Sequence, residues 1–243
     1  MQDRMEGFFA SLVNWLNLAL DLIYPSSAGC PMCRAQNCQC KAQILNNYFM
    51  RSTCKRCGKF AVTGSLCGEC FARGEGFPDK VLALAPYEGK MREVLHRFKF
   101  SGNRQCGKFL AELLLAGPVR DLAGIDLVIP VPLHKTRLRQ RGFNQAEVLA
   151  KALALGANLP IMTDLLSKEI PTDSQASLAR HQRLTNLEAA FRVTRPQFTH
   201  GKRILLVDDI TTTGATLEAC GLALRQAGAA HLTAICVAAG KLR

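Results

Sequence analysis

The sequence has no uninterrupted hydrophobic stretch of about 20 residues, the length that a membrane-spanning helix needs. It also has no low-complexity tract, and with 48% hydrophobic residues it is too apolar for a disordered chain. Acidic residues are scarce, 19 against 31 Lys and Arg, which gives a net charge of +12. We therefore expect a globular protein without stable membrane insertion, whose partners are nucleotides, nucleic acid or another anion.

The first 28 residues are expected to form an amphipathic helix. Between Met5 and Ile23 the apolar positions repeat at helical spacing. Acidic side chains precede this stretch and asparagines interrupt it, whereas a secretory signal has a basic start and an unbroken apolar centre. We expect a cytoplasmic protein in which this helix docks on the core. Binding of the helix to a membrane surface is the alternative.

Eight of the 11 cysteines lie between Cys30 and Cys70. Without a secretory signal, such closely spaced thiols are expected to be reduced and to bind a metal. Two Cys-x-x-Cys pairs fit a tetrahedral structural Zn²⁺ site, and Gly58 and Gly68 would allow the tight turns of its knuckles. The four ligands predicted for this site are Cys54, Cys57, Cys67 and Cys70.

A second group of cysteines lies upstream of these pairs. Its members are Cys30, Cys33, Cys38 and Cys40. The Cys-x-Cys spacing leaves two arrangements open: these four bind a second zinc ion, or Cys30 and Cys33 cross over and share a metal with a later pair. Zinc would be structural in either arrangement, because all its ligands come from the protein. The scattered Cys106, Cys220 and Cys236 are expected to be small core residues.

A turn-forming stretch at 74–78 separates a predicted zinc-ribbon module at 29–76 from a predicted α/β domain at 77–243. In the second part short apolar runs alternate with helical segments, the pattern of a mostly parallel sheet flanked by helices. The predicted strands are Val81–Pro86, Leu127–Val131, part of Leu159–Leu166, Ile204–Val207 and Leu232–Val237. The predicted helices are Gly89–Phe98, Cys106–Leu115, Asn144–Leu155 and Thr216–Ala227.

The segment Arg203–Leu217 predicts a phosphate site. An apolar strand runs into two adjacent aspartates, and a Thr/Gly turn then opens a helix that should end at Gly228. Backbone N–H groups and hydroxyls at a helix start suit a phosphate. Asp208 and Asp209, which we expect to face solvent, can accept hydrogen bonds from vicinal sugar hydroxyls. Together these features outline a ribose 5-phosphate.

Residues 207–216, Val-Asp-Asp-Ile-Thr-Thr-Thr-Gly-Ala-Thr, resemble the motif with which type I phosphoribosyltransferases bind phosphoribosyl pyrophosphate (PRPP). With the upstream cysteines, four further motifs resemble the ComF/GntX family of competence-associated proteins. These motifs are Tyr87–Gly89, His96–Phe100, Val131–His134 and Arg137–Gln145. The resemblance implies a type I phosphoribosyltransferase-like fold, PRPP bound with Mg²⁺, and catalytic roles for Asp208 and Asp209. It assigns to PRPP binding Asp208, Asp209, Thr211, Thr212, Thr213, Gly214, Ala215 and Thr216.

The resemblance places pyrophosphate on the basic stretch after the predicted strand Leu127–Val131, because a charged leaving group needs cations. The residues assigned to it are Pro132, Leu133, His134, Lys135, Arg137 and Arg141. The alternative is a row of arginines on an exposed helix end. The polar stretch Ile170–Asn186 is expected to be a mobile lid, or else a plain surface loop.

Two hypotheses of function follow. As an enzyme, the protein transfers a phosphoribosyl group from PRPP to an unidentified acceptor in the context of natural competence and DNA uptake. As a binding protein, it senses PRPP and contacts single-stranded DNA or proteins of the DNA-uptake machinery. Both hypotheses are compatible with a homo-oligomer. A purely structural zinc adaptor would leave the two aspartates unexplained.

Binding of single-stranded DNA would need a basic face with aromatic side chains between the charges. The candidates for one such face around the mouth of the site are Arg97, Lys99, Arg104, Lys108, Arg137, Arg139 and Arg141, with Phe98, Phe100 and Phe143. In the alternative interpretation these aromatic residues belong to the core.

Overall fold

A computed structural model of the chain describes residues 29–50, 52–60, 66–71, 73–102, 104–170 and 190–241. The predicted helix at 1–28 and almost all of the predicted lid at 170–186 lie outside the described residues. None of the helices within these ranges has the length and apolar character needed to span a bilayer.

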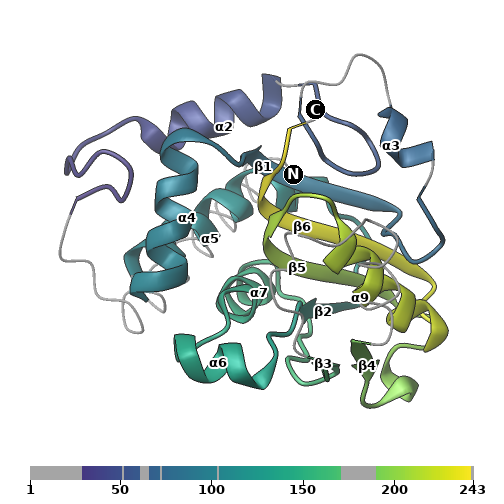
Figure 1. Cartoon of the computed structure of the whole chain (residues 1–243). Coiled ribbons are helices and arrows are strands. Elements are labelled where there is room, and N and C mark those ends of the chain that lie inside the picture. Colours follow the sequence, from purple (N-terminus) through teal and green to yellow (C-terminus); the bar gives the residue numbers. More distant parts are fainter. Residues whose placement is uncertain are drawn as a thin grey trace, which may run out of the picture.

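A fully parallel sheet of four strands, in the order β1-β6-β5-β2, forms the centre of the structure (Figure 1). The strands are β1 (Lys80–Pro86), β2 (Leu127–Pro130), β5 (Arg203–Thr211) and β6 (His231–Ala239). The four strands predicted at these places are confirmed. β5 is longer than its apolar run because its ladder with β6 continues through polar residues, from Asp208 opposite Cys236 to Thr211 opposite Ala239.

The strand predicted within Leu159–Leu166 is mostly wrong. Ile161 forms only an isolated parallel bridge to Val128, at the edge of the sheet beyond β2. The next strand, β3 (Leu166–Lys168), instead pairs antiparallel with β4 (Phe191–Val193) in a separate two-stranded sheet. β3 ends shortly before residue 171 and β4 begins shortly after residue 189. The two paired strands therefore flank the segment predicted as a lid.

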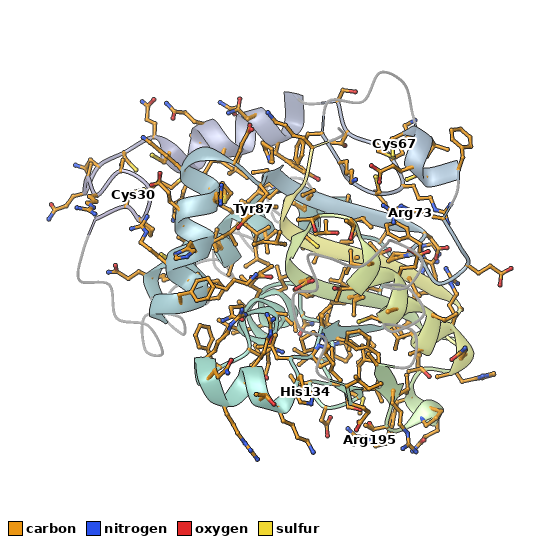
Figure 2. The ribbon with its side chains drawn as sticks, in the orientation of Figure 1. Cys30, Cys67, Arg73, Tyr87, His134 and Arg195 are labelled. Atoms are coloured by element: carbon orange, nitrogen blue, oxygen red, sulfur yellow. The ribbon has the colours of Figure 1, made fainter. Side chains whose placement is uncertain are left out.

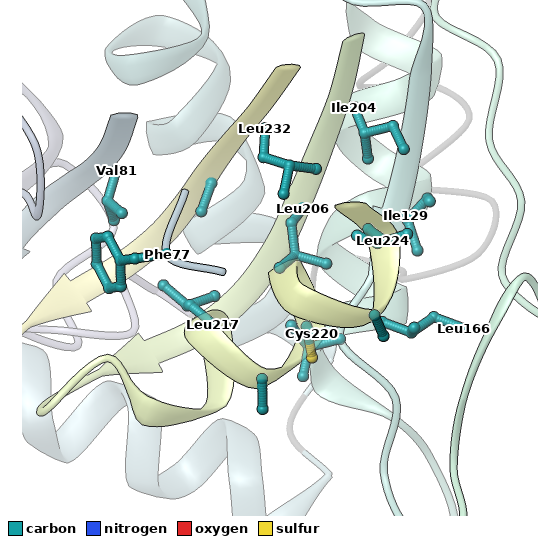
Figure 3. Packing of buried hydrophobic residues seen from close by; sticks show 14 of the residues in the cluster. Phe77, Val81, Ile129, Leu166, Ile204, Leu206, Leu217, Cys220, Leu224 and Leu232 are labelled. Atoms are coloured by element: carbon teal, nitrogen blue, oxygen red, sulfur yellow. The ribbon is translucent and has the colours of Figure 1, made fainter. Parts of the chain in front are cut away.

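Helices cover both faces of the parallel sheet, as the sequence predicted. One face packs against α4 (Gly89–Ser101), α5 (Arg104–Ala116) and α7 (Gln145–Gly156), and the other packs against α9 (Ala215–Gln226). Alternate β5 residues serve the two faces. Ile204 and Leu206 belong to the cluster around α9, which Figure 3 shows, and Leu205 and Val207 belong to the other cluster. Burial on both sides explains the continuous apolar runs of these strands.

Three shorter helices were not among the predicted elements. They are α2 (Cys40–Met50), α3 (Gly68–Phe71) and α6 (Lys135–Arg141). α2 packs against β1 and α5, so it joins the cysteine-rich part of the chain to the sheet. The pair Cys54 and Cys57 is also attached to β1, because the N–H of Val81 donates a 2.8 Å hydrogen bond to the carbonyl of Arg56 between them.

Candidate functional site

Asp208 and Asp209, near the carboxyl end of β5, point to opposite faces of the sheet because side chains alternate along a strand. Asp208 lies on the α9 side and is partly exposed, whereas Asp209 lies on the α4 and α7 side and is only 6% exposed. The expectation that both face solvent is therefore wrong for Asp209. The two carboxylates have different neighbours and cannot be chemically equivalent.

Lys99, in the last turn of α4, balances the charge of Asp209. Its Nζ lies 2.9 Å from Oδ2 of Asp209. The Lys99 carbonyl accepts a 3.3 Å hydrogen bond from Nε2 of Gln145, whose Oε1 accepts a 3.2 Å bond from Arg141. Because an isolated buried carboxylate is costly, this cation is part of the site. From the sequence, Lys99 belongs to the motif His96–Phe100 and is a candidate for DNA binding, but it was not connected with Asp209, because no local pattern links residues 99 and 209.

Burial raises the pKa of Asp208 to about 8, and the negative charge of Asp209 adds to the increase. Lys99 lowers this pKa, as does the N–H of Asp209, which donates a 2.8 Å hydrogen bond to Oδ1 of Asp208. Asp208 therefore takes up and releases a proton much closer to neutral pH than an ordinary carboxyl group does.

The turn between β5 and α9 presents small polar side chains and backbone. Thr212 and Thr213 are exposed, and Gly214 adopts the left-handed conformation with φ 83° as the N-cap of α9. This conformation suits glycine, which has no Cβ. The first N–H groups of a helix have no partner within it, so the start of α9 can donate to an anion. The predicted end of the helix is confirmed, since Gly228 has a φ of 86° directly after the C-cap.

Residues 131–134 lie beside the aspartates because β2 pairs with β5. The N–H of Val131 donates to the carbonyl of Val207 at 2.9 Å, and Asn144 Nδ2 donates to the Val131 carbonyl at 3.0 Å. Pro132 and Leu133 follow, both half-buried. His134 is the N-cap of α6, and its Nδ1 accepts a 3.3 Å hydrogen bond from the N–H of Thr136.

The basic residues of α6 divide between two sides of the helix. Arg137 and Arg141 are spaced four residues apart and are half-buried, whereas Lys135 and Arg139 are exposed. Burial lowers the pKa of Arg141, and the charge of Asp209 opposes that shift. Arg141 is thus near the carboxylate pair. The basic residues 135–141 therefore form a helix, and one side of this helix lies at the site.

Lys168 of β3 is a further cation near the site, which sequence reasoning missed. Burial lowers its pKa, and the charges of Arg137 and Asp208 act on it in opposite directions. Its Nζ lies 5.3 Å from the centroid of the Phe191 ring. It could not be recognised in advance because the predicted strand ended at Leu166, and only the β3–β4 hairpin brings this lysine towards Asp208.

The prediction that the basic and aromatic residues form one face around the site is wrong. Phe98 is 2% exposed and packs against Phe143, with their ring centroids 5.7 Å apart. Arg97 hydrogen-bonds the carbonyl of Pro31, and Lys108 lines a cavity beside the upstream cysteines. Phe100, by contrast, is 62% exposed. Only part of the predicted face therefore surrounds the carboxylates.

The downstream cysteines form the first of two four-thiol clusters. The Sγ atoms of Cys54, Cys57, Cys67 and Cys70, called here the Cys54 cluster, lie within 4.8 Å of one another and are buried. Three of the sulfur–sulfur distances are 3.5–3.6 Å. Four thiolates at about 2.3 Å from a tetrahedral zinc ion would be about 3.8 Å apart, so the cluster fits structural zinc.

The glycines of the Cys54 cluster have different roles. Gly58 has a φ of 68° and donates a 2.9 Å hydrogen bond to the Cys54 carbonyl, as expected of a knuckle turn. Gly68 begins α3 without a positive φ, and the turn there is closed by the N–H of Cys70, which donates a 3.0 Å hydrogen bond to the Cys67 carbonyl.

The upstream cysteines form a second cluster of their own. Cys30, Cys33, Cys38 and Cys40, called here the Cys30 cluster, also have Sγ atoms within 4.8 Å of one another, with Cys33 and Cys38 exposed. The crossed arrangement is therefore wrong, and the Cys-x-Cys spacing is compatible with a four-thiol metal site. Figure 2 shows Cys30 and Cys67 on opposite sides of the molecule, so the two clusters are separate.

Comparison with known proteins covers the segment that contains the β5 motif. A family model described as the phosphoribosyl transferase domain matches residues 140–242. The chain is 32% identical to Competence protein F of Haemophilus influenzae over 184 residues, which cover 72% of this chain and 79% of that protein.

Two other relatives have similar coverage. Competence protein ComFC of Bacillus subtilis is 28% identical over 235 residues, covering 93% of this chain and 88% of that protein. The DNA utilization protein YhgH of Escherichia coli is 28% identical over 193 residues, covering 77% of this chain and 84% of that protein.

Proposed function

Because the chain belongs to the ComF family of competence proteins and has the type I phosphoribosyltransferase fold, we propose that it binds PRPP at the carboxyl end of β5. The observation that carries this proposal is the order of groups there. A carboxylate pair, one member partly exposed, is followed at once by a Thr/Gly turn at the start of a helix. A sugar phosphate carries both the hydroxyls and the phosphate that these two kinds of group can bind.

In this proposal Asp208 and Asp209 hold the ribose hydroxyls. The 5-phosphate is bound by N–H groups and hydroxyls of the segment Thr211–Thr216, including Thr212, Thr213, Gly214 and Ala215. About five charge-assisted hydrogen bonds, worth roughly 1.5–3 kcal/mol each, exceed what diffuse surface charge contributes at physiological salt. The turn, rather than the net charge of the chain, therefore selects the ligand.

The pyrophosphate would lie against the segment 132–134 and the inner side of α6. Pro132, Leu133, His134 and Lys135 supply backbone and polar groups there, and Arg137 and Arg141 supply cations near the carboxylate pair. Mg²⁺ would arrive with PRPP and neutralise its phosphates, and the carboxylate oxygen of Asp208 is a ligand of the type that Mg²⁺ prefers.

As a transferase, the protein would join an acceptor to C1 of the ribose. The acceptor's electron pair forms the new bond, the bond from C1 to pyrophosphate breaks with its electrons, and the acceptor's proton passes to water. Arg137 and Arg141 stabilise the charge that develops on pyrophosphate. Lys99 lies 2.9 Å from Oδ2 of Asp209 and supplies a positive charge beside the buried carboxylate.

A second candidate is a PRPP sensor that binds single-stranded DNA. The observation in its favour is Phe100, which is 62% exposed beside the site. The Arg141 guanidinium lies 5.4 Å from its ring centroid, and the His96 ring lies 4.5 Å from it. An exposed aromatic ring among cations is a stacking surface for a base. The names of the relatives, competence and DNA utilization proteins, agree with this candidate.

Calorimetric titration with PRPP and Mg²⁺ tests the shared part of both candidates. The double variant Asp208→Asn, Asp209→Asn should bind at least about 100-fold more weakly, because two acceptors of charged hydrogen bonds are lost. Asp164→Asn, which changes an exposed carboxylate paired with Arg195, is the control. Equal affinity of the double variant and the wild type would refute the site.

Release of pyrophosphate separates the two candidates. A transferase should release it from PRPP when a panel of nucleobases, amines and other metabolites is supplied as acceptors. A sensor should bind PRPP equally well but should release no pyrophosphate with any of these acceptors.

A further inference from the structure

Arg73 is a buried cation between the Cys54 cluster and the turn that follows β5. Its side chain is 1% exposed, and its guanidinium carbon lies 3.9 Å from the centroid of the Phe77 ring. Nη2 donates a 2.9 Å hydrogen bond to the carbonyl oxygen of Thr213. In the view of Figure 2, Arg73 lies between Cys67 and α9. It is thus a direct link from the cysteine-rich segment to the proposed phosphate site.

The hydrogen bond to Thr213 orients one peptide of the turn. In a trans peptide the carbonyl and the following N–H point in opposite directions, and the described residues contain no cis peptide. Because the Thr213 carbonyl is turned towards Arg73, the N–H of Gly214 is turned away from it. This N–H is one of the donors that the proposed function assigns to phosphate.

The turn also rests directly on Arg73 and Phe77. A Cβ added to Gly214 would lie 2.7 Å from Cε2 of Phe77 and 2.9 Å from Nη1 of Arg73, which is too close for either. Close approach continues along α9, where a Cβ on Gly221 would lie 2.0 Å from the carbonyl oxygen of Gly76. The shape of the turn therefore depends on the segment 73–77.

The position of Arg73 in turn depends on the Cys54 cluster. Its guanidinium lies 3.6 Å from Glu69 and 3.7 Å from Glu218. Glu69 precedes Cys70 on α3, and both its oxygens accept 2.8 Å hydrogen bonds from Lys59. Bound zinc supplies much of the folding free energy of a small ribbon. Loss of the metal would release α3 and, with it, Arg73.

Arg73 is not fully satisfied in this position. Its Nε and Nη1 are buried and make no hydrogen bond with any residue that the structure describes. A buried arginine with unused donors is costly, so the arrangement is kept only while the surrounding structure enforces it. This is the behaviour expected of a contact that responds to the state of its neighbours.

We propose that metal in the Cys54 cluster sets the affinity of the turn at 211–214 for phosphate, and that Arg73 is the positioning residue that transmits the effect. The inference rests on the proposed PRPP site. Such coupling is reciprocal, so PRPP must strengthen zinc binding by the same factor by which zinc strengthens PRPP binding. The Cys30 cluster, on the opposite side of the molecule, serves as an internal control.

Calorimetry with PRPP and Mg²⁺ on the full chain tests the first half of the proposal. Arg73→Met and Cys67→Ser should each weaken PRPP binding about tenfold or more, the usual effect of losing a hydrogen bond from a charged donor. The double variant should be no weaker than Cys67→Ser alone, because both changes break one connection. Cys33→Ser should leave the affinity unchanged. Arg73→Lys keeps the positive charge but lacks the planar guanidinium group. It is the variant to use if Arg73→Met does not fold.

Zinc affinity, measured by competition with a chelator, tests the second half without any catalysis. In Cys33→Ser protein, where the Cys54 cluster is intact, saturating PRPP should raise the zinc affinity by the factor found in calorimetry. In Cys33→Ser, Arg73→Lys protein the same PRPP saturation should raise it much less.

The outcomes distinguish this inference from the proposed function. A wild-type protein that does not bind PRPP overturns both. PRPP binding that is equally tight in wild type, Arg73→Lys and Cys67→Ser overturns the coupling alone. So does zinc affinity that PRPP leaves unchanged, or a Cys54 cluster that contains no metal after reducing purification.

Discussion

Two adjacent aspartates acquire different properties because a strand turns them to opposite faces. Asp209 is buried and is neutralised by Lys99 at 2.9 Å, whereas Asp208 is partly exposed and its pKa is raised to about 8. Asp208 therefore exchanges a proton near physiological pH, whereas Asp209 lies against a cation. Such a pair can both accept and donate hydrogen bonds to vicinal hydroxyls.

Asp208→Asn should stabilise the protein at alkaline pH. The pKa of Asp208 is about 8 in the folded state and 3.8 in the reference state. Between these values the folded protein binds more protons than the unfolded chain, so the stability contributed by this group falls as pH rises. Asparagine carries no charge, so the variant should gain most over the wild type above about pH 8. Urea unfolding at low and high pH measures the difference. A pH-independent difference would show that Asp208 ionises normally.

Lys99→Gln should destabilise the protein by about 1–3 kcal/mol, because Asp209 would lose its charge partner while remaining buried. Lys151→Gln is the matched control. Lys151 pairs with Glu147 at 2.6 Å, but its side chain is 61% exposed, and exposed pairs contribute little. Denaturant unfolding at one pH compares both variants with the wild type. Equal losses in the two variants would contradict the buried pair.

At the scale of elements, the site is made where parallel strands end at one edge. β5 carries the aspartates and leads into the turn, and the neighbouring strand β2 leads into the segment before α6. Lys99 comes from α4, which covers the face of the sheet to which Asp209 points. The turn takes its shape from packing below it as much as from its own residues, since Gly214 contacts Phe77 and Arg73 directly.

Gly214→Ala should destroy PRPP binding and destabilise the start of α9. The change adds a left-handed backbone penalty of roughly 1–2 kcal/mol and a clash with Phe77 and Arg73. Gly142→Ala is the matched control, since Gly142 has a similar φ of 78° but nothing within 4 Å of an added Cβ. Thermal unfolding should show a small loss of stability for Gly142→Ala and a larger loss for Gly214→Ala. PRPP titration should show weak binding only for Gly214→Ala. Equal behaviour of the two would exclude the close packing.

At the scale of the whole molecule, the basic residues that the structure describes lie in more than one place. The net charge of +12 includes Arg97 and Lys108 beside the Cys30 cluster as well as Arg137 and Arg141 beside the carboxylates. These groups favour polyanions in general. In the second candidate function, binding of single-stranded DNA depends instead on Phe100 and Arg141 beside the site.

Phe100→Ala should weaken binding of single-stranded DNA several-fold, since stacking of one base is worth about 1–3 kcal/mol. PRPP affinity should change little. Phe198→Ala is the matched control, because Phe198 is also exposed, at 44%, with an arginine 5.5 Å from its ring centroid. Titrations at several salt concentrations should show a steep loss of DNA binding and a shallow loss of PRPP binding. Equal effects of both phenylalanine variants would place DNA elsewhere.

The sequence determined what depends on local pattern and spacing. Continuous apolar runs predicted the four strands of the sheet, because strands buried on both faces have no polar alternation. The order of two aspartates, a Thr/Gly turn and a helix predicted the strand, turn and helix on which the proposed PRPP site rests, and the paired cysteines predicted thiol clusters. These inferences needed only neighbours along the chain, and the family resemblance rests on the same short motifs.

Only the tertiary structure decided which distant groups meet. The pairing of β2, β5 and β6 and the packing of α4 place Lys99 against Asp209, residues 110 positions apart in the chain. The same packing buries Phe98, separates the two cysteine clusters and sets Arg73 beneath the turn at Thr213. Such contacts leave no local signature, because burial and charge pairing depend on how the elements fold against one another.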